Sequence, residues 1–342
     1  MDIKLFDFEL PEKLIAQTPL ESRDQSRMLF INKADKTYSD EHFFNIISNL
    51  RPGDVIVRNN TRVIPARLFG TKESTNAHVE LLLLNPVGPD TYECIVGNAK
   101  VVKPGTHIVF LKDILEADCL EIGEEGIRVV KFTYSSSTLL EALEVVGQTP
   151  LPPYIKEKLV DQERYQTIYA KEPGSAAAPT AGLHFTKSID DKIKALGVTI
   201  LEITLHVGLG TFRPVKVNDT NDHVMHYEHY EINIETAKLL NIAKDRKQRI
   251  IAVGTTTLRT LEANYRKFSC FKAEKSKTDL FITPGSKILS IDGLLTNFHL
   301  PKSTLIMLIS SFIGREFTLE LYRHAIEKEY RFFSFGDCML IL

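Results

Sequence analysis

Several features that would place a sequence quickly in a class are missing here. The cysteines are scattered, none within four residues of another, so no zinc or redox pair is visible. They are Cys94, Cys119, Cys270 and Cys338. The longest apolar stretch, Leu305–Ile313, is far shorter than the ~20 residues that a membrane-spanning helix needs. The first residues, MDIKLFDFELPEK, have no apolar core and no cleavage site, so we expect no signal peptide.

A strong excess of either charge is also absent. The 42 basic and 44 acidic residues leave a formal net charge of −2, which argues against binding nucleic acid through a global positive field. A local basic groove is still compatible with this balance. Scattered cysteines without a leader fit a reducing compartment, so we expect the protein to be cytoplasmic.

What is present is an ordinary globular composition. Of 342 residues, 43% are apolar and 25% are charged, which fits one large domain or two of usual size. A chain of this length buries roughly 75% of its unfolded surface and therefore needs no disulfide or metal staple.

The texture of the sequence changes twice along the chain. Residues 27–32 and 54–59 read as strands, and Asp40 is expected to cap a helix through residues 42–50. Between 66 and about 135, six short strand-like runs are separated by turn residues, which is typical of a small antiparallel barrel or sandwich.

Helix and strand patterns alternate again after residue 146, with strands expected at 198–208, 249–254 and near both 296 and the C-terminus. We therefore predict an α/β main domain, a mixed sheet with helices, from residues 1–65 and 146–342. A small antiparallel β-barrel domain would be inserted at 66–145.

Two glycine-containing stretches are candidates for ligand contact. GSAAAPTAGLHFT (174–186) has small residues, among them Thr180 and Gly182, before His184 at a helix entry. A loop of small residues with a packing histidine would give the same pattern. LHVGLGTF (205–212) leads a strand into a turn, but it lacks the third glycine of a dinucleotide fingerprint, so we reject NAD. A tight turn is the alternative there. The residues of interest around it are His206, Gly208, Gly210, Thr211 and Arg213.

AVGTTTLRTLE (252–262) joins a strand to a helix. Backbone N–H groups and the hydroxyls of Thr255 and Thr256 at a helix start suit an anion, and Arg259 one turn later can add a bidentate contact. An ordinary N-cap with an exposed arginine is the competing interpretation.

The segment HVMHYEHYE (223–231) spaces His223, His226 and His229 by three residues. On a helix they would share a face and suggest a metal-dependent hydrolase. However, YEHYEINI alternates as a strand does, which separates His226 from His229. A substrate-facing pair of His226 and Glu228 is the better hypothesis, with no metal.

Other polar residues occur where strands end or domains join. Asn297 and His299 lie at a strand end before a helix that begins at a proline, and strand ends are where α/β proteins bind ligands. Arg62, Arg331 and Asp337 are candidates to line a cleft, although internal ion pairs would also explain them.

Taken together, these segments resemble one family, the S-adenosylmethionine:tRNA ribosyltransferase-isomerases of queuosine biosynthesis. The matching segments follow the same order and cover nearly the full length; they include LPEKLIAQTP, NNTRVIPARL, LPPYI, DQERYQTIYA, GSAAAPTAGLHFT, TLHVGLGTFRPV, HVMHYE, AVGTTTLRTLE, LFITPG, LLTNFHLPKSTLIMLISSFIG and YRFFSFGDCMLI. Two positions depart from the family pattern: Asn60 replaces the usual Asp, and residues 225–228 read MHYE in place of an MHSE-like segment.

The resemblance implies an α/β fold with an inserted barrel, and an enzyme that transfers and isomerises the ribosyl group of S-adenosylmethionine. The acceptor would be 7-aminomethyl-7-deazaguanine at the anticodon wobble position of tRNA, and the products epoxyqueuosine-tRNA, adenine and methionine. S-adenosylmethionine would be a consumed co-substrate, so no cofactor is expected. The expected partners are tRNA and S-adenosylmethionine, without a membrane, and the expected state is a monomer.

From this we assign His184, His206, His226 and Glu228 to proton transfer. The start of the helix at Thr255 and Thr256, with Arg259, would hold an anion, and Gly208 and Gly210 would allow close approach of S-adenosylmethionine. Substrate contacts are further expected from Arg62, Thr180, Gly182, Thr211, Arg213, Asn297, His299, Arg331 and Asp337.

Overall fold

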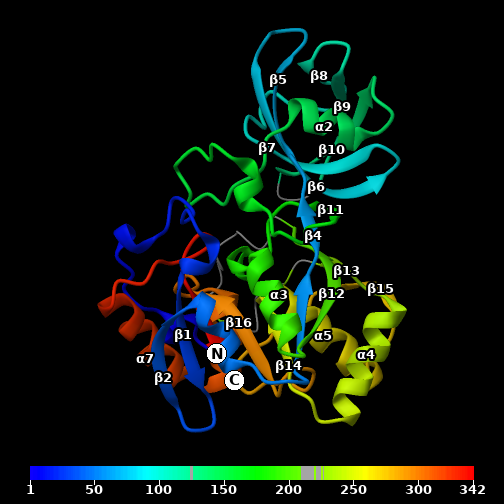
Figure 1. Cartoon of the computed structure of the whole chain (residues 1–342). Helices are drawn as coiled ribbons and strands as arrows, with labels where there is room; N and C mark the ends of the chain where they lie inside the picture. Colours follow the sequence, from blue (N-terminus) through cyan, green and yellow to red (C-terminus); the bar gives the residue numbers. More distant parts are fainter. Residues whose placement is uncertain (124–125, 209–218, 221–224, 226) are drawn as a thin grey trace. The chain divides into compact units, whose positions relative to one another are not determined.

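The computed structural model describes residues 1–123, 126–208, 219–220, 225 and 227–342 (Figure 1). They form two compact units. The first comprises Met1–Arg62, Pro153–Glu172 and Ala178–Leu342, and the second comprises Val63–Pro152 and Pro173–Ala177. The sequence predicted an inserted domain at residues 66–145, and this domain division stays a prediction.

A nine-stranded mixed sheet is the centre of the first unit. Its order is β15-β13-β12-β3-β14-β16-β17-β1-β2. The strands are β1 (Arg27–Asn32), β2 (Thr37–His42), β3 (Val55–Asn59), β12 (Thr199–His206), β13 (Glu228–Ile232), β14 (Ile250–Val253), β15 (Glu274–Thr278), β16 (Gly293–Asn297) and β17 (Cys338–Ile341). A separate two-stranded sheet pairs β4 (Thr61–Val63) with β11 (Glu172–Ser175).

Strand direction decides where the sheet presents its polar ends. β12, β3, β14 and β16 are neighbours and run parallel, so their carboxyl ends meet at one edge. β17 runs antiparallel to β16 and parallel to β1, so these two strands begin at the edge where β16 ends. Residues that follow the parallel strands and residues that precede β1 and β17 therefore share this edge.

Helices cover both faces of the sheet. Because side chains alternate along a strand, Met28 and Leu340 pack with residues of α1 and α3 on one face, while Leu29 and Met339 pack with α6 and α7 on the other. The helices of this unit are α1 (Ile46–Asn49), α3 (Lys187–Ala195), α4 (Ile234–Asp245), α5 (Thr255–Phe268), α6 (Thr304–Ile313) and α7 (Arg315–Glu327).

The second unit contains a closed six-stranded antiparallel barrel in the order β10-β7-β6-β5-β8-β9. Its strands are β5 (Arg67–Lys72), β6 (His78–Gly88), β7 (Thr91–Val96), β8 (His107–Leu111), β9 (Leu115–Ile122) and β10 (Arg128–Tyr134), followed by α2 (Leu139–Val146). Inward residues such as Leu81, Val130 and Phe132 form its core. The predicted fold class, an α/β sheet with helices plus a small antiparallel barrel, is confirmed.

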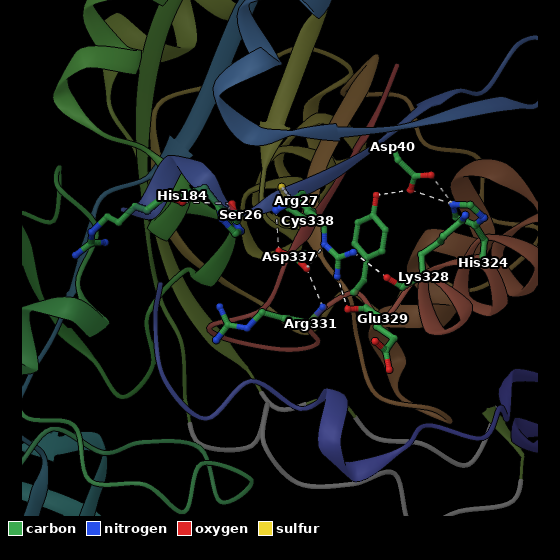
Figure 2. Close-up of polar contacts among 12 residues, drawn as sticks. Ser26, Arg27, Asp40, His184, His324, Lys328, Glu329, Arg331, Asp337 and Cys338 are labelled. Carbon is green, nitrogen blue, oxygen red and sulfur yellow. Dashed lines mark hydrogen bonds and ion pairs between the residues drawn. The ribbon is translucent and has the colours of Figure 1, made fainter. Parts of the chain in front are cut away.

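One local prediction is wrong. Asp40 was expected to cap a helix, but residues 37–42 form β2 and pair with β1, so the helical segment begins only with a 3₁₀ turn at Phe43. The Asp40 carboxylate instead accepts hydrogen bonds from Tyr330 (2.6 Å) and His324 (3.0 Å), as Figure 2 shows. Pairing with β1 fixes the backbone as extended where the sequence alone suggests a cap.

Of the helices that the structure describes, none combines the length and the apolar composition needed to cross a membrane.

Candidate functional site

The shared edge of the sheet gathers many of the predicted site residues. His206 ends β12, Asn297 ends β16, and Thr255 follows β14 through Gly254. Small ligands in α/β proteins bind at the carboxyl ends of strands, so this edge is the natural place for a site.

His184 is the most completely fixed of the candidate side chains. It ends the 3₁₀ helix η7 (Thr180–His184) and is 4% exposed. Its Nδ1 lies 2.7 Å from Ser26 Oγ, and its Nε2 lies 3.0 Å from Asn297 Oδ1. The Phe43 ring packs against the imidazole with centroids 5.3 Å apart. These contacts hold the ring in one orientation.

The hydrogen-bond pattern assigns the tautomer of His184. The Asn297 side-chain nitrogen donates to the Phe333 carbonyl (2.8 Å), which leaves Oδ1 to face the imidazole as an acceptor. The His184 Nε2 therefore carries the proton, and Nδ1 accepts from the Ser26 hydroxyl. Figure 2 shows the contact between Ser26 and His184.

Electrostatics keep this imidazole neutral. Burial lowers the pKa of His184 below its ordinary value; the Asn297 hydrogen bond and the Asp337 charge oppose this, and the positive charges of Arg23 and Arg331 reinforce it. A histidine with a pKa below 6.5 is neutral at pH 7 and is able to accept a proton. Together with Ser26 it lines a pocket of about 30 Å³.

His206, at the end of β12, has a different environment from His184. Its Nδ1 lies 2.8 Å from Thr61 Oγ1, and it faces His229 across the β12–β13 pair. Burial lowers its pKa; the Glu172 and Glu231 charges oppose this, and His229 adds to it. His206 is thus a second neutral imidazole.

A larger polar hollow of about 220 Å³ lies beside these strands, lined in part by Asn60, Thr204 and Glu231. The Thr204 hydroxyl donates to Asn60 Oδ1 at 2.7 Å. An aspartate at position 60 would accept the same hydrogen bond, so this contact does not depend on asparagine.

Glu228 and Arg259 are brought together as a buried ion pair, each residue 4% exposed. Arg259 also donates from Nε to the Leu280 carbonyl at 3.0 Å. The sequence assigned a proton-transfer role to one and anion binding to the other. In the structure, each neutralises the charge of its partner, which weakens both assignments in this state.

The start of α5 has no side-chain cap among the described residues. Gly254 precedes the helix with φ of 88°, a left-handed conformation that favours glycine, and it offers no side chain as a cap. The Thr257 hydroxyl donates back to Val253 (2.7 Å), while the Thr256 hydroxyl is buried without a hydrogen-bond partner among the described residues. The anion site expected here stays a prediction.

Several other predicted contacts are engaged with the protein itself. Arg62 pairs with Glu163, and the buried Asp337 accepts from the backbone N–H groups of Arg27 and Arg331, both at 2.8 Å (Figure 2). Asp337 therefore ties the start of β1 to the loop before β17. The His299 Nε2 lies 2.9 Å from Oγ1 of Thr296, a buried residue of β16.

The glycines predicted to contact the substrate have different surroundings. A Cβ on Gly182 would lie 2.1 Å from the Tyr169 hydroxyl, so close packing of η7 already explains that glycine, next to half-buried Thr180. Around Gly208, no atom of the described residues lies within 4 Å of an ideal Cβ. The remaining predicted residues lie outside the described residues; they are Gly210, Thr211, Arg213, His223 and His226.

The His229 side chain is exposed in β13, and the predicted strand at this segment is present. Among the residues that the structure describes, no group of three His, Cys, Asp or Glu side chains could hold a metal ion. His223 and His226, the other members of the proposed metal cluster, are not covered by that search.

Sequence reasoning missed three residues of the His184 pocket: Ser26, Arg23 and Arg164. Ser26 immediately precedes β1, and Arg23 belongs to the 3₁₀ helix η3 (Arg23–Gln25). Ser26 could have been identified from its position directly before a strand that begins at this edge of the sheet.

Known proteins match this chain over nearly its whole length. Residues 3–341 match the family described as queuosine biosynthesis protein. The chain belongs to this family. Among solved structures, it is similar to the S-adenosylmethionine tRNA ribosyltransferase from Thermotoga maritima, with 38% sequence identity and a TM-score of 0.57. That match covers 99% of this chain and 100% of the other. The resemblance stated from sequence motifs is thus confirmed at the level of the family.

Proposed function

We propose that this protein transfers and isomerises the ribosyl moiety of S-adenosylmethionine onto 7-aminomethyl-7-deazaguanine at the wobble position of tRNA. The products are epoxyqueuosine-tRNA, adenine and methionine. The observation that carries the proposal is the match over nearly the whole chain, at 38% identity, to an S-adenosylmethionine tRNA ribosyltransferase. Family membership over residues 3–341 supports it independently.

The chemistry requires a base, because the positive sulfur of S-adenosylmethionine makes the adjacent 5′ carbon acidic. Removal of a proton there opens the sugar as adenine leaves with the bonding electron pair and takes up a proton. The amine of the tRNA base then attacks, and methionine departs as the epoxide closes. A base with a pKa near the working pH is most effective in such a step.

His184 suits this role among the proton-transfer candidates. It is neutral, its tautomer is fixed by Asn297, and its Nδ1 reaches a pocket through Ser26. Substituting such a residue costs roughly 10²- to 10⁴-fold in rate. His206, His226 and Glu228 complete the proposed set, with Glu228 acting only if its pair with Arg259 opens.

The remaining substrate contacts belong to the same proposal. S-adenosylmethionine is consumed, and no resident cofactor takes part. We further propose that the protein is cytoplasmic and acts on tRNA as a monomer. Light scattering of the purified protein in solution tests the oligomeric state.

The reaction is tested by incubating the protein with S-adenosylmethionine and tRNA that carries 7-aminomethyl-7-deazaguanine. Equal release of adenine and methionine, with one ribosyl-derived unit added to the tRNA mass, is the expected result. Formation of S-adenosylhomocysteine would show methyl transfer instead, and no turnover on correctly modified tRNA would reject the proposal.

A further inference from the structure

Two arginines, Arg23 and Arg164, line the same small pocket as Ser26 and His184. Its volume of about 30 Å³ exceeds the roughly 10–15 Å³ that a cavity needs to hold one water molecule, so it has room for one small group. Leu20 and Phe335 contribute apolar walls.

Hydrogen bonds to backbone carbonyls hold both guanidinium groups in place, and each arginine reaches the segment that carries the other. Arg23 donates to the carbonyls of Gln166 (2.8 Å) and Glu163 (3.0 Å). Arg164 donates in the opposite direction, to the carbonyls of Glu21 (3.2 Å) and Leu20. Both side chains are therefore positioned before any ligand arrives, which lowers the entropy lost on binding.

Carbonyl oxygens fix these groups but do not neutralise them. Arg58 and Arg249, by contrast, pair with carboxylates, Arg58 with Asp190 (2.7 Å) and Arg249 with Asp54 (2.5 Å). Within the part of the chain that the structure describes, neither Arg23 nor Arg164 forms an ion pair with a carboxylate closer than 4.0 Å.

The two like charges also act on each other. Burial lowers the pKa of Arg23, and the charge of Arg164 lowers it further, while the negative charges of Asp161 and Glu163 oppose both effects. Holding two cations together in a partly desolvated pocket is unfavourable unless an anion joins them. The arrangement therefore favours an anionic ligand.

We propose that Arg23 and Arg164 bind the methionine carboxylate of S-adenosylmethionine in this pocket. This inference rests on the proposed function. The pocket has room for a carboxylate, and guanidinium groups bind carboxylates through paired, charge-assisted hydrogen bonds. The neighbouring His184 would then lie beside the methionine chain that leads to the sulfur and the acidic 5′ carbon.

This assignment differs from the anion site expected at α5. There the charge of Arg259 is already balanced by the buried Glu228, whereas the charges of Arg23 and Arg164 are not paired in this way. A tRNA phosphate is the competing anion. A phosphate site would change tRNA binding and its salt dependence rather than S-adenosylmethionine binding.

The experiment compares S-adenosylmethionine with decarboxylated S-adenosylmethionine, which lacks only the carboxylate. Binding of both to the wild type, Arg23→Gln and Arg164→Gln is measured by calorimetry. We expect each substitution to weaken S-adenosylmethionine binding by about 10- to 100-fold, as loss of charge-assisted hydrogen bonds does, and to leave the analogue within about threefold. Because both ligands are measured on the same folded variant, a general loss of structure cannot imitate this selectivity.

Arg315→Gln is the matched control, since Arg315 pairs with its exposed neighbour Glu316 on α7. Unchanged preference for the carboxylate in both pocket variants would overturn the inference. So would intact S-adenosylmethionine binding combined with weaker tRNA binding and a salt slope reduced by about one, which identifies a phosphate site. Wild-type release of adenine and methionine is scored separately; its absence rejects the proposed function, not the anion pocket.

Discussion

His184 and Asn297 are 113 residues apart in the sequence, yet Nε2 of the first lies 3.0 Å from Oδ1 of the second. The contact joins the end of η7 to the end of β16, and it sets which imidazole nitrogen is protonated. A neutral amide in this place orients the ring without raising its pKa as strongly as a carboxylate would. Asn at this position therefore keeps the His184 imidazole neutral, as the proposed role of base requires.

Asn297→Asp should move the pH dependence of the reaction. A carboxylate beside Nε2 favours the imidazolium and would raise the pKa of His184. Because the base must be neutral, the acidic limb of kcat should move to higher pH. Adenine release measured across the pH range tests this, with Asn297→Ala as the control that loses orientation without adding charge. An acidic limb unchanged in Asn297→Asp would remove His184 from the role of base.

Stability should fall as the pH is lowered, in part because of His299. Burial lowers its pKa from 6.5 to about 3 in the folded protein. Between these two values the unfolded chain binds the proton and the folded chain does not, so acidification favours unfolding. From pH 7 to pH 5 this histidine alone should cost about 2 kcal/mol of unfolding free energy. His299→Gln should make the decrease smaller by that amount in urea unfolding. An equal decrease in the variant and the wild type would contradict the assignment.

Gly182→Ala should destabilise the protein through a clash rather than through loss of ligand contact. The new Cβ would lie 2.1 Å from the Tyr169 hydroxyl, and overpacking of this kind costs about 1–3 kcal/mol. Tyr169→Phe removes that oxygen, which has no hydrogen-bond partner among the described residues. The double variant should therefore regain part of the lost stability in thermal unfolding. Without any recovery, the contact with the Tyr169 hydroxyl would be excluded as the main origin of the effect.

Much of the fold follows from local patterns. The barrel strands are short, separated by turn residues and adjacent in sequence, so alternation and turn chemistry were enough to find them. β14 and α5 were found because Gly254 and the threonines mark a strand-to-helix junction. Asp40 shows the limit, since pairing of residues 37–42 with β1 overrode a plausible helix cap.

The candidate site was less accessible to sequence reasoning. His184 and Asn297 were both singled out, but their contact, and the part of Ser26, depend on how three distant segments meet at one edge of the sheet. The pairing of Glu228 with Arg259 was equally invisible, because each residue has a plausible separate role. Residue type predicts what a side chain is able to do, while its partner decides what remains available.

The position of β17 bears on how the protein reaches its folded state. This strand lies between β16 and β1 in the middle of the large sheet. During synthesis, β1 and β2 cannot join the rest of the sheet until residues 338–341 have left the ribosome. The barrel strands pair only with one another, and all of them are complete by residue 134. We therefore expect the barrel to fold during translation, while β1 and β2 wait with unpaired edges, which makes this period the one most exposed to aggregation.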